Sequence, residues 1–172
     1  MDAIGTVFEK LRKTIEKKGI AVLRIAVGII FFWFGFLKFF VDVSAAEAIA
    51  SKTISWLTFD SLRPEVSMPI LAVLECGIGI GILTKKYMGY VIPVLYFQMA
   101  GTLLPLVIFP NETWEIPPFV PTLEGQYIIK NAVLIAAGIV LGAIAKGAKL
   151  INDPEVAQTA KTIEKQKEAA EA

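Results

Sequence analysis

Polar side chains interrupt four long apolar stretches of this chain, and their types and positions define a candidate site. They are Lys38, Glu75, Gln98, Lys130 and Asn131. A charge at bilayer depth costs about 2.5–3.5 kcal/mol on insertion scales, so such residues are usually paired and usually functional. A carboxylate beside an ammonium can relay a proton or hold the polar end of a ligand. These five residues are therefore the candidates for ligand binding or proton relay.

Lys38 and Glu75 are expected to form an ion pair. Side chains on a helix tilt toward its N-terminus. Lys38 lies near the outer end of the first stretch and tilts inward, whereas Glu75 lies on a helix that runs inward and leans outward. The two side chains converge, and each ion alone in a low-dielectric site is far costlier than the pair.

One face of the first stretch is built to meet a neighbouring helix closely. Residues at 4-3-4-3 spacing share that face: they are Arg24, Gly28, Phe31, Gly35 and Lys38. Glycines on such a face let another helix approach. Arg24 points toward the inner side, where we expect it to reach lipid headgroups.

Structural roles compete with the functional ones. Lys130 can extend to the outer interface, while Gln98 and Asn131 can serve as hydrogen bonds between helices. The Lys38–Glu75 pair can act as a folding and register device. In the functional interpretation, all five candidates gather in the outer half of the protein, beneath the loop 110–122.

The elements that must position these residues are membrane-spanning helices. The apolar stretches cover residues 20–41, 66–83, 87–109 and 126–145, each close to the ~20 residues that cross a bilayer. The chain is 55% hydrophobic and 19% charged, with a mean hydropathy of +0.63. The stretches are apolar all round rather than striped. The sequence predicts an all-α integral membrane four-helix bundle over 20–145.

Lysine and arginine alternate between the two sides. They concentrate in residues 1–19, at the turn 84–86 and in the tail 146–172, whereas the loop 110–124 contains none. The positive-inside rule then places both termini in the cytoplasm and two loops outside.

The remaining segments have simpler patterns. The pattern of residues 1–18 predicts either an amphipathic helix on the inner leaflet or an extension of the first spanning helix. Residues 45–57 predict a short helix on the outer face, and the proline-rich loop 110–122 predicts a stiff, irregular cover. The tail 146–172 predicts a solvated helix. Gly77 and Gly81 suit close helix packing, either within the bundle or between protomers.

Composition limits the chemistry and the partners of the chain. With no histidine and a single cysteine, Cys76, it lacks the ligands of His-type haem, zinc and copper sites and has no internal disulfide. No cofactor is therefore expected to be held covalently or by His and Cys. The net charge of +1 gives no reason to expect nucleic-acid binding. The expected partner is the lipid bilayer.

Several segments match a known pattern. They are Arg24-Ile25-Ala26-Val27-Gly28, Gly35-Phe36-Leu37-Lys38, and Leu74-Glu75 followed by Gly79 and Gly81. Together they resemble the DoxX family of small bacterial four-helix membrane proteins. Residues 121–131 are similar to the start of the last helix in some DoxX-like members, and 53–59 to the YkgB-type branch. The resemblance covers about residues 20–145.

The resemblance implies a location in the bacterial cytoplasmic membrane and an association with redox assemblies, including thiosulfate:quinone oxidoreduction. The leading hypothesis is an accessory, redox-associated membrane subunit that is not an enzyme alone. Its outer-half polar pocket would hold a quinone, a lipid or another small molecule, and a redox partner subunit would carry the cofactor. The alternatives are a small transporter or permeation component and a structural assembly factor with no ligand.

Overall fold

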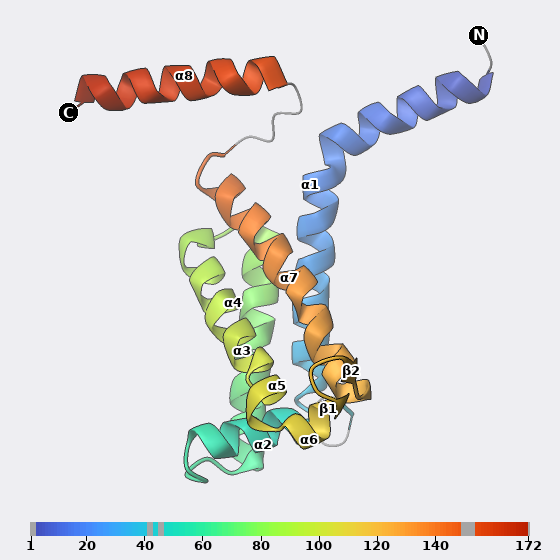
Figure 1. The fold of residues 1–172 in the computed structure, drawn as a ribbon, viewed down its shortest axis with the longest axis vertical. Helices are drawn as coiled ribbons and strands as arrows, with labels where there is room; N and C mark the ends of the chain where they lie inside the picture. Colours follow the sequence, from blue (N-terminus) through green and yellow to red (C-terminus); the bar gives the residue numbers. More distant parts are fainter. Residues whose placement is uncertain (1–2, 41–42, 45–46, 149–153, 172) are drawn as a thin grey trace.

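The computed structural model describes residues 3–40, 43–44, 47–148 and 154–171. Its elements are α1 (Ala3–Leu37), α2 (Glu47–Leu57), α3 (Pro64–Thr84), α4 (Met88–Leu103), α5 (Pro105–Ile108), α6 (Pro110–Thr113), β1 (Trp114–Ile116), β2 (Val120–Pro121), α7 (Leu123–Ala145) and α8 (Pro154–Glu171). The described part is mostly helical (Figure 1). It includes four helices long and apolar enough to cross a membrane: Lys18–Leu37, Pro64–Thr84, Met88–Ile108 and Leu123–Ala145.

Local signals set the ends of the long helices. Arg63 is extended before Pro64, the first residue of α3, because the residue before a proline disfavours the helical conformation. At the other end of α3, Lys85 adopts a left-handed conformation and its N–H reaches the carbonyl of Ile82. The hydroxyl of Thr122 caps α7 by accepting the N–H of Gly125 at 3.1 Å.

The third stretch, predicted for 87–109, is present as the candidate span Met88–Ile108, which is interrupted once and so consists of α4 followed by α5. The break falls at Leu104, before Pro105. Proline has no N–H to donate and its ring clashes with the preceding turn. The N–H of Leu104 bonds instead to the carbonyl of Gly101 at 3.3 Å, a tighter turn than in an α-helix.

The loop 110–122 is more regular than predicted. It forms the single turn α6 and then the antiparallel hairpin β1–β2, in which Trp114 pairs with Pro121 and Ile116 with Val120. The helix expected within 45–57 is present as α2. The tail contains the expected helix, α8.

Helix α1 runs without interruption from Ala3 to Leu37. The candidate membrane span within it begins at Lys18, and the amphipathic N-terminal helix on the inner leaflet stays a prediction. Figure 1 shows that the N-terminal part of α1 leans away from the rest, and that both chain ends lie at the same end of the molecule.

The long helices pack in pairs. α1 lies against α3 and α4 against α7, with further contacts of α3 with α4 and of α1 with α7. One hydrophobic core joins all four; its buried members are Val27, Phe31, Ile78, Ile82, Ile92, Leu95, Met99, Ala137 and Leu141.

Glycines make the contact between α1 and α3 a close one, as the spacing on the first stretch predicted. A Cβ added at Gly28 would lie 2.7 Å from the side chain of Leu83 and 3.2 Å from the carbonyl oxygen of Gly79. A Cβ at Gly35 would lie 2.8 Å from the backbone of Cys76. The two backbones therefore touch along several turns.

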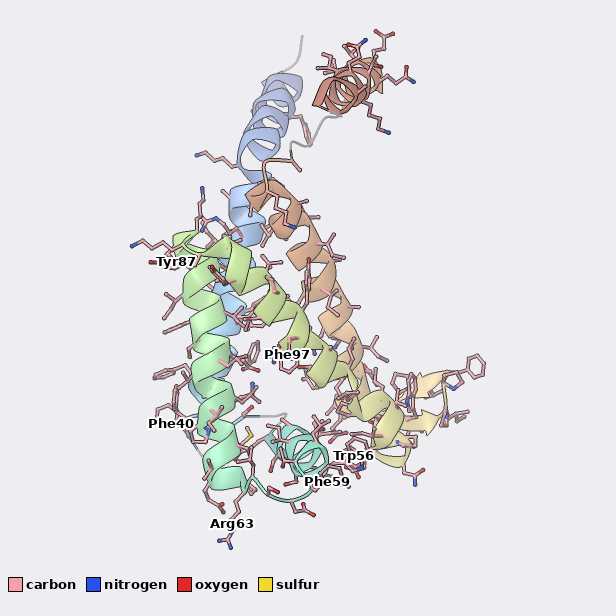
Figure 2. All side chains as sticks on the ribbon, turned by 90° about the vertical axis from the view of Figure 1, so that its left-hand side faces the viewer. Phe40, Trp56, Phe59, Arg63, Tyr87 and Phe97 are labelled. Atoms are coloured by element: carbon pink, nitrogen blue, oxygen red, sulfur yellow. The ribbon has the colours of Figure 1, made fainter. Side chains whose placement is uncertain are left out.

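These contacts also set a stagger between α1 and α3. The end of α1 is level with Glu75, in the middle of α3. Beyond that level α3 extends for a further ~16 Å toward Pro64, at ~1.5 Å per residue. In Figure 2, Phe40 accordingly lies well short of Arg63, and α2 lies across the end of the molecule that α1 does not reach.

Candidate functional site

Lys38 and Glu75 form a buried ion pair, which confirms the predicted contact. The ammonium Nζ lies 2.6 Å from Glu75 Oε2, and each side chain is 8% exposed. Lys38 directly follows the last residue of α1. The C-terminal end of a helix carries a partial negative charge, so the ammonium is stabilised by both α1 and the carboxylate.

Gln98 of α4 completes a network that spans three helices. Its Nε2 donates to Glu75 Oε1 at 2.8 Å and to Thr102 Oγ1 at 3.2 Å. The Thr102 hydroxyl in turn donates to the backbone carbonyl of Gln98 at 3.0 Å. Both oxygens of Glu75 therefore have a partner. We call Lys38, Glu75, Gln98 and Thr102 the polar network.

The polar network has unused hydrogen-bonding capacity. Because the Thr102 hydroxyl donates its proton to the Gln98 carbonyl, it accepts from Nε2, and this fixes the orientation of the amide. Gln98 Oε1 is then left buried without a donor in the described part of the chain. Buried acceptors nearly always have a partner, so water or a ligand is expected there. The Lys38 ammonium has three N–H donors, and the one bond described for it among the residues that the structure describes goes to Glu75 Oε2.

Lys130 and Asn131 do not join the polar network, contrary to the prediction that all five candidates gather. Lys130 is exposed, and its ammonium lies 5.1 Å from the ring centroid of Tyr127. Ile128 faces the interior. Lys130 comes two positions later, about 200° around the helix, and therefore lies on the opposite, outward side. Asn131 is half-buried, and none of the hydrogen bonds described for α7 connects it to Glu75 or Gln98.

An open hollow between α4 and α7 is lined mainly by apolar side chains. It has a volume of about 420 Å³ and is lined by Tyr96, Ala100, Leu103, Ile135 and Ile139, between α4 and α7. Ala100 lies about 200° around α4 from Gln98. The hollow is therefore on the opposite side of α4 from the polar network, and the expected polar pocket is not this space.

The two glycines singled out for protomer contacts differ in their surroundings. A Cβ at Gly81 would collide with Val91 of the same chain, so Gly81 serves packing within the molecule. Gly77 is exposed, and a Cβ there would meet nothing within 4 Å. Of the pair, Gly77 alone is available for a contact between chains.

Arg24 has a different partner from the lipid headgroups that the sequence suggested. Its Nη1 donates to the carbonyl of Ile82 at 2.9 Å and to that of Leu83. These are among the last four carbonyls of α3, for which the helix has no N–H group one turn further along. A cation at this end of a helix also interacts favourably with the helix dipole. Arg24 therefore caps α3, and Arg24 and Lys38 join α1 to α3 at the two ends of the glycine contact.

Replacing Arg24 with methionine should lower the free energy of unfolding by about 1.5–3 kcal/mol, the usual contribution of a hydrogen bond from a charged group. The carbonyl of Leu83 would then lose the guanidinium donor, and the carbonyl of Ile82 would keep only the N–H of Lys85. Denaturant unfolding in mixed micelles measures the loss. Lys86→Met, at an exposed position beyond the same helix end, should change stability by less than about 0.5 kcal/mol. Equal effects of the two variants would contradict the cap.

One polar contact away from the network had no signal in the sequence. Lys52 of α2 pairs with Glu112 of α6, and its ammonium lies 4.6 Å from the ring centroid of Phe109. These residues come from two different loops, about 60 positions apart. We call this contact the Lys52 clasp.

The described residues contain no cluster of three or more Cys, Asp or Glu side chains suited to a metal ion. Cys76 is half-buried, and its thiol lies 3.6 Å from the carbonyl oxygen of Phe32. Comparisons with protein-family models, curated proteins and solved structures find no match to this chain.

Proposed function

We propose that this protein is an accessory, multi-pass membrane subunit whose polar network binds the head group of a quinone. The observation that carries the proposal is the buried Gln98 Oε1, which has no donor in the described part of the chain, in the same network as the Lys38–Glu75 pair. A quinone carbonyl accepts hydrogen bonds, and a quinol hydroxyl donates them. The network thus offers Lys38 to the oxidised form and Gln98 to the reduced form. Glu75 would accept a proton of the quinol when the redox partner subunit takes its electrons.

The proposed setting is the bacterial cytoplasmic membrane, with four helices in a bundle and both termini in the cytoplasm. Its support is the alternation of basic segments along the chain and the resemblance to DoxX-like proteins. In this setting Arg24 and Lys85 mark the inner interface. Lys38 lies about 21 Å from Arg24 along α1, at ~1.5 Å per residue, in a hydrocarbon layer of ~30 Å. The polar network then lies in the outer half of the membrane.

Quinone content after purification with native lipids tests the proposal. Lipid extraction and mass spectrometry should recover a quinone from the unchanged protein, as from a known quinone-binding membrane protein treated in parallel. Lys38→Met and Gln98→Leu should each reduce the recovered quinone about tenfold, because each removes a buried hydrogen bond to the head group.

Lys130→Met is the matched control, since Lys130 comes from the same set of candidates but is exposed over Tyr127. It should retain the quinone content of the unchanged protein. Recovery of no quinone from the unchanged protein would refute the proposal. An equal loss in all three variants would show that the quinone is bound somewhere else.

A structural role is the second candidate, and one observation favours it: Glu75 has partners from both neighbouring helices for its two oxygens. The network would then hold α1, α3 and α4 in register without any ligand. The combined variant Lys38→Met with Glu75→Leu separates the two candidates. A structural device predicts unchanged partner assembly and unchanged bound molecules in this variant, whereas a quinone site predicts the loss of the quinone.

A further inference from the structure

Helix α2 packs against the part of α3 that α1 does not reach. α1 ends level with Glu75, so it does not run alongside the part of α3 between Glu75 and Pro64. Figures 1 and 2 show α2 lying across this end, beside the beginning of α3 and close to α6. α2 contacts α3, and its buried residues are Ile49 and Thr53. α2 therefore packs against α3 on the side of Pro64, where α1 does not continue beyond the level of the network.

Two buried polar atoms on the covered side are without partners in the described part of the chain. One is Gln98 Oε1, in the network, and the other is Ser67 Oγ, near the beginning of α3. Ser67 is 3% exposed and Gln98 is 8% exposed. Ser67 lies about 12 Å beyond Glu75 along α3, at ~1.5 Å per residue. An unpartnered buried hydroxyl or amide oxygen costs about 1–3 kcal/mol, so both atoms are expected to bind water or a polar group of a ligand.

The attachment of α2 on the side of α6 is polar and half-exposed. Its components are the Lys52–Glu112 ion pair, whose side chains are 50% and 43% exposed, and the contact of Lys52 with the Phe109 ring. Exposed ion pairs and cation–π contacts are each weak and reversible. A contact of this kind can open without disturbing the hydrophobic core, which lies among α1, α3, α4 and α7.

We propose that α2 is a movable cover, held closed by the Lys52 clasp, through which water and the polar end of the ligand reach the network. When α2 lifts, Ser67 Oγ and Gln98 Oε1 gain hydrogen-bond partners. The proposal rests on the network being a binding site, and it adds the route of access and the residue that controls it.

Cysteine labelling in nanodiscs tests the cover, since both faces of the protein are open to reagents there. In a Cys76→Ala background, Ser67→Cys places a thiol at a buried position near the beginning of α3, the helix that α2 contacts. A charged maleimide reports how often water-soluble molecules reach it. Lys52→Met keeps the apolar stem over Phe109 but removes the charge. It should raise the labelling rate at position 67 about fivefold or more, the size expected from losing both contacts of the clasp.

Three controls make the result specific. Lys86→Met, an exposed lysine at the opposite end, should leave the rate at position 67 unchanged. A thiol at the exposed Asp60 should react at one rate in all backgrounds, and one at Ile82, which is fully buried, should stay unreactive. An unchanged rate at position 67 in Lys52→Met would overturn the cover. So would an equal rise at positions 67 and 82, because the protein would then be opening as a whole.

Hydrogen exchange on the protein without engineered cysteines gives a second measurement. Lys52→Met should speed exchange of the amides of α2 and leave those of α4 unchanged; equal exchange in α2 would count against the cover. Failure of this inference is distinguishable from failure of the proposed function. If quinone is recovered but Lys52→Met does not change the labelling rate at position 67, only the cover is refuted. If Lys52→Met raises this rate but no quinone is recovered, only the quinone as ligand is refuted.

Discussion

Replacing Glu75 with alanine should cost about 3–5 kcal/mol of unfolding free energy, more than replacing Lys38 and Glu75 together. The single change leaves the Lys38 ammonium, which is 8% exposed, buried without its carboxylate. It also removes an acceptor from Gln98 Nε2. The combined variant Lys38→Met with Glu75→Leu removes both charges and refills their volume. Thermal or denaturant unfolding in detergent micelles compares the two.

Glu65→Ala is the matched control for this comparison. Glu65 belongs to the same helix as Glu75 but is exposed in its first turn. Exposed substitutions usually change stability by no more than about 0.5 kcal/mol. Equal destabilisation by Glu75→Ala and by the combined variant would show that the pair is not the source of the loss. A residual loss in the combined variant would measure what Gln98 contributes through its bond to Glu75.

Gly79→Ala should destabilise the protein by about 3 kcal/mol or more, at the upper end of what overpacking costs. A Cβ at Gly79 would lie 2.5 Å from the backbone nitrogen of Phe32 and 2.8 Å from the carbonyl oxygen of Gly28. These are backbone atoms and cannot rotate away, so α1 and α3 would have to separate. The separation would also strain the Lys38–Glu75 pair and the Arg24 cap, which lie on either side. Denaturant unfolding measures the effect.

Gly77→Ala is the internal comparison, made two residues away on the same helix. Gly77 has open space around its Cα, so an added methyl group meets nothing. Alanine is favoured over glycine inside a helix by about 0.5–1 kcal/mol, and this variant should be as stable as the unchanged protein or more so. If both variants lose the same stability, the close α1–α3 contact is not what limits the protein. If Gly77→Ala alters the oligomeric state, Gly77 lies at a contact between chains.

The two largest effects fall on the same pair of helices. Arg24, the glycine contact and the Lys38–Glu75 pair follow one another along α1, and all three connect it to α3. α4 is held to this pair partly through Gln98 and Glu75. Loss of Glu75 therefore affects three helices at once. For this reason we expect a residue that is proposed to handle a proton to carry a large share of the stability as well.

The sequence by itself determined the four apolar helices, because continuous runs of about 20 apolar residues have few other stable arrangements. It also determined that Lys38 and Glu75 meet. Two opposite charges in an apolar environment have a strong physical reason to pair, and the tilt of helical side chains brings them together. The close approach of α1 to its neighbour followed from glycines on one face.

Only the tertiary structure decided which further polar residues join the pair. A helix that is apolar all round has no polar stripe to show which face points inward. The sequence therefore did not determine how α7 is rotated about its axis, nor whether Lys130 is exposed. The stagger of α1 against α3 decided that Arg24 meets the end of α3 and that α2 packs against a part of α3 that α1 does not reach. The Lys52 clasp joins residues from two loops. Such a contact depends on how the whole chain folds, and no local pattern encodes it.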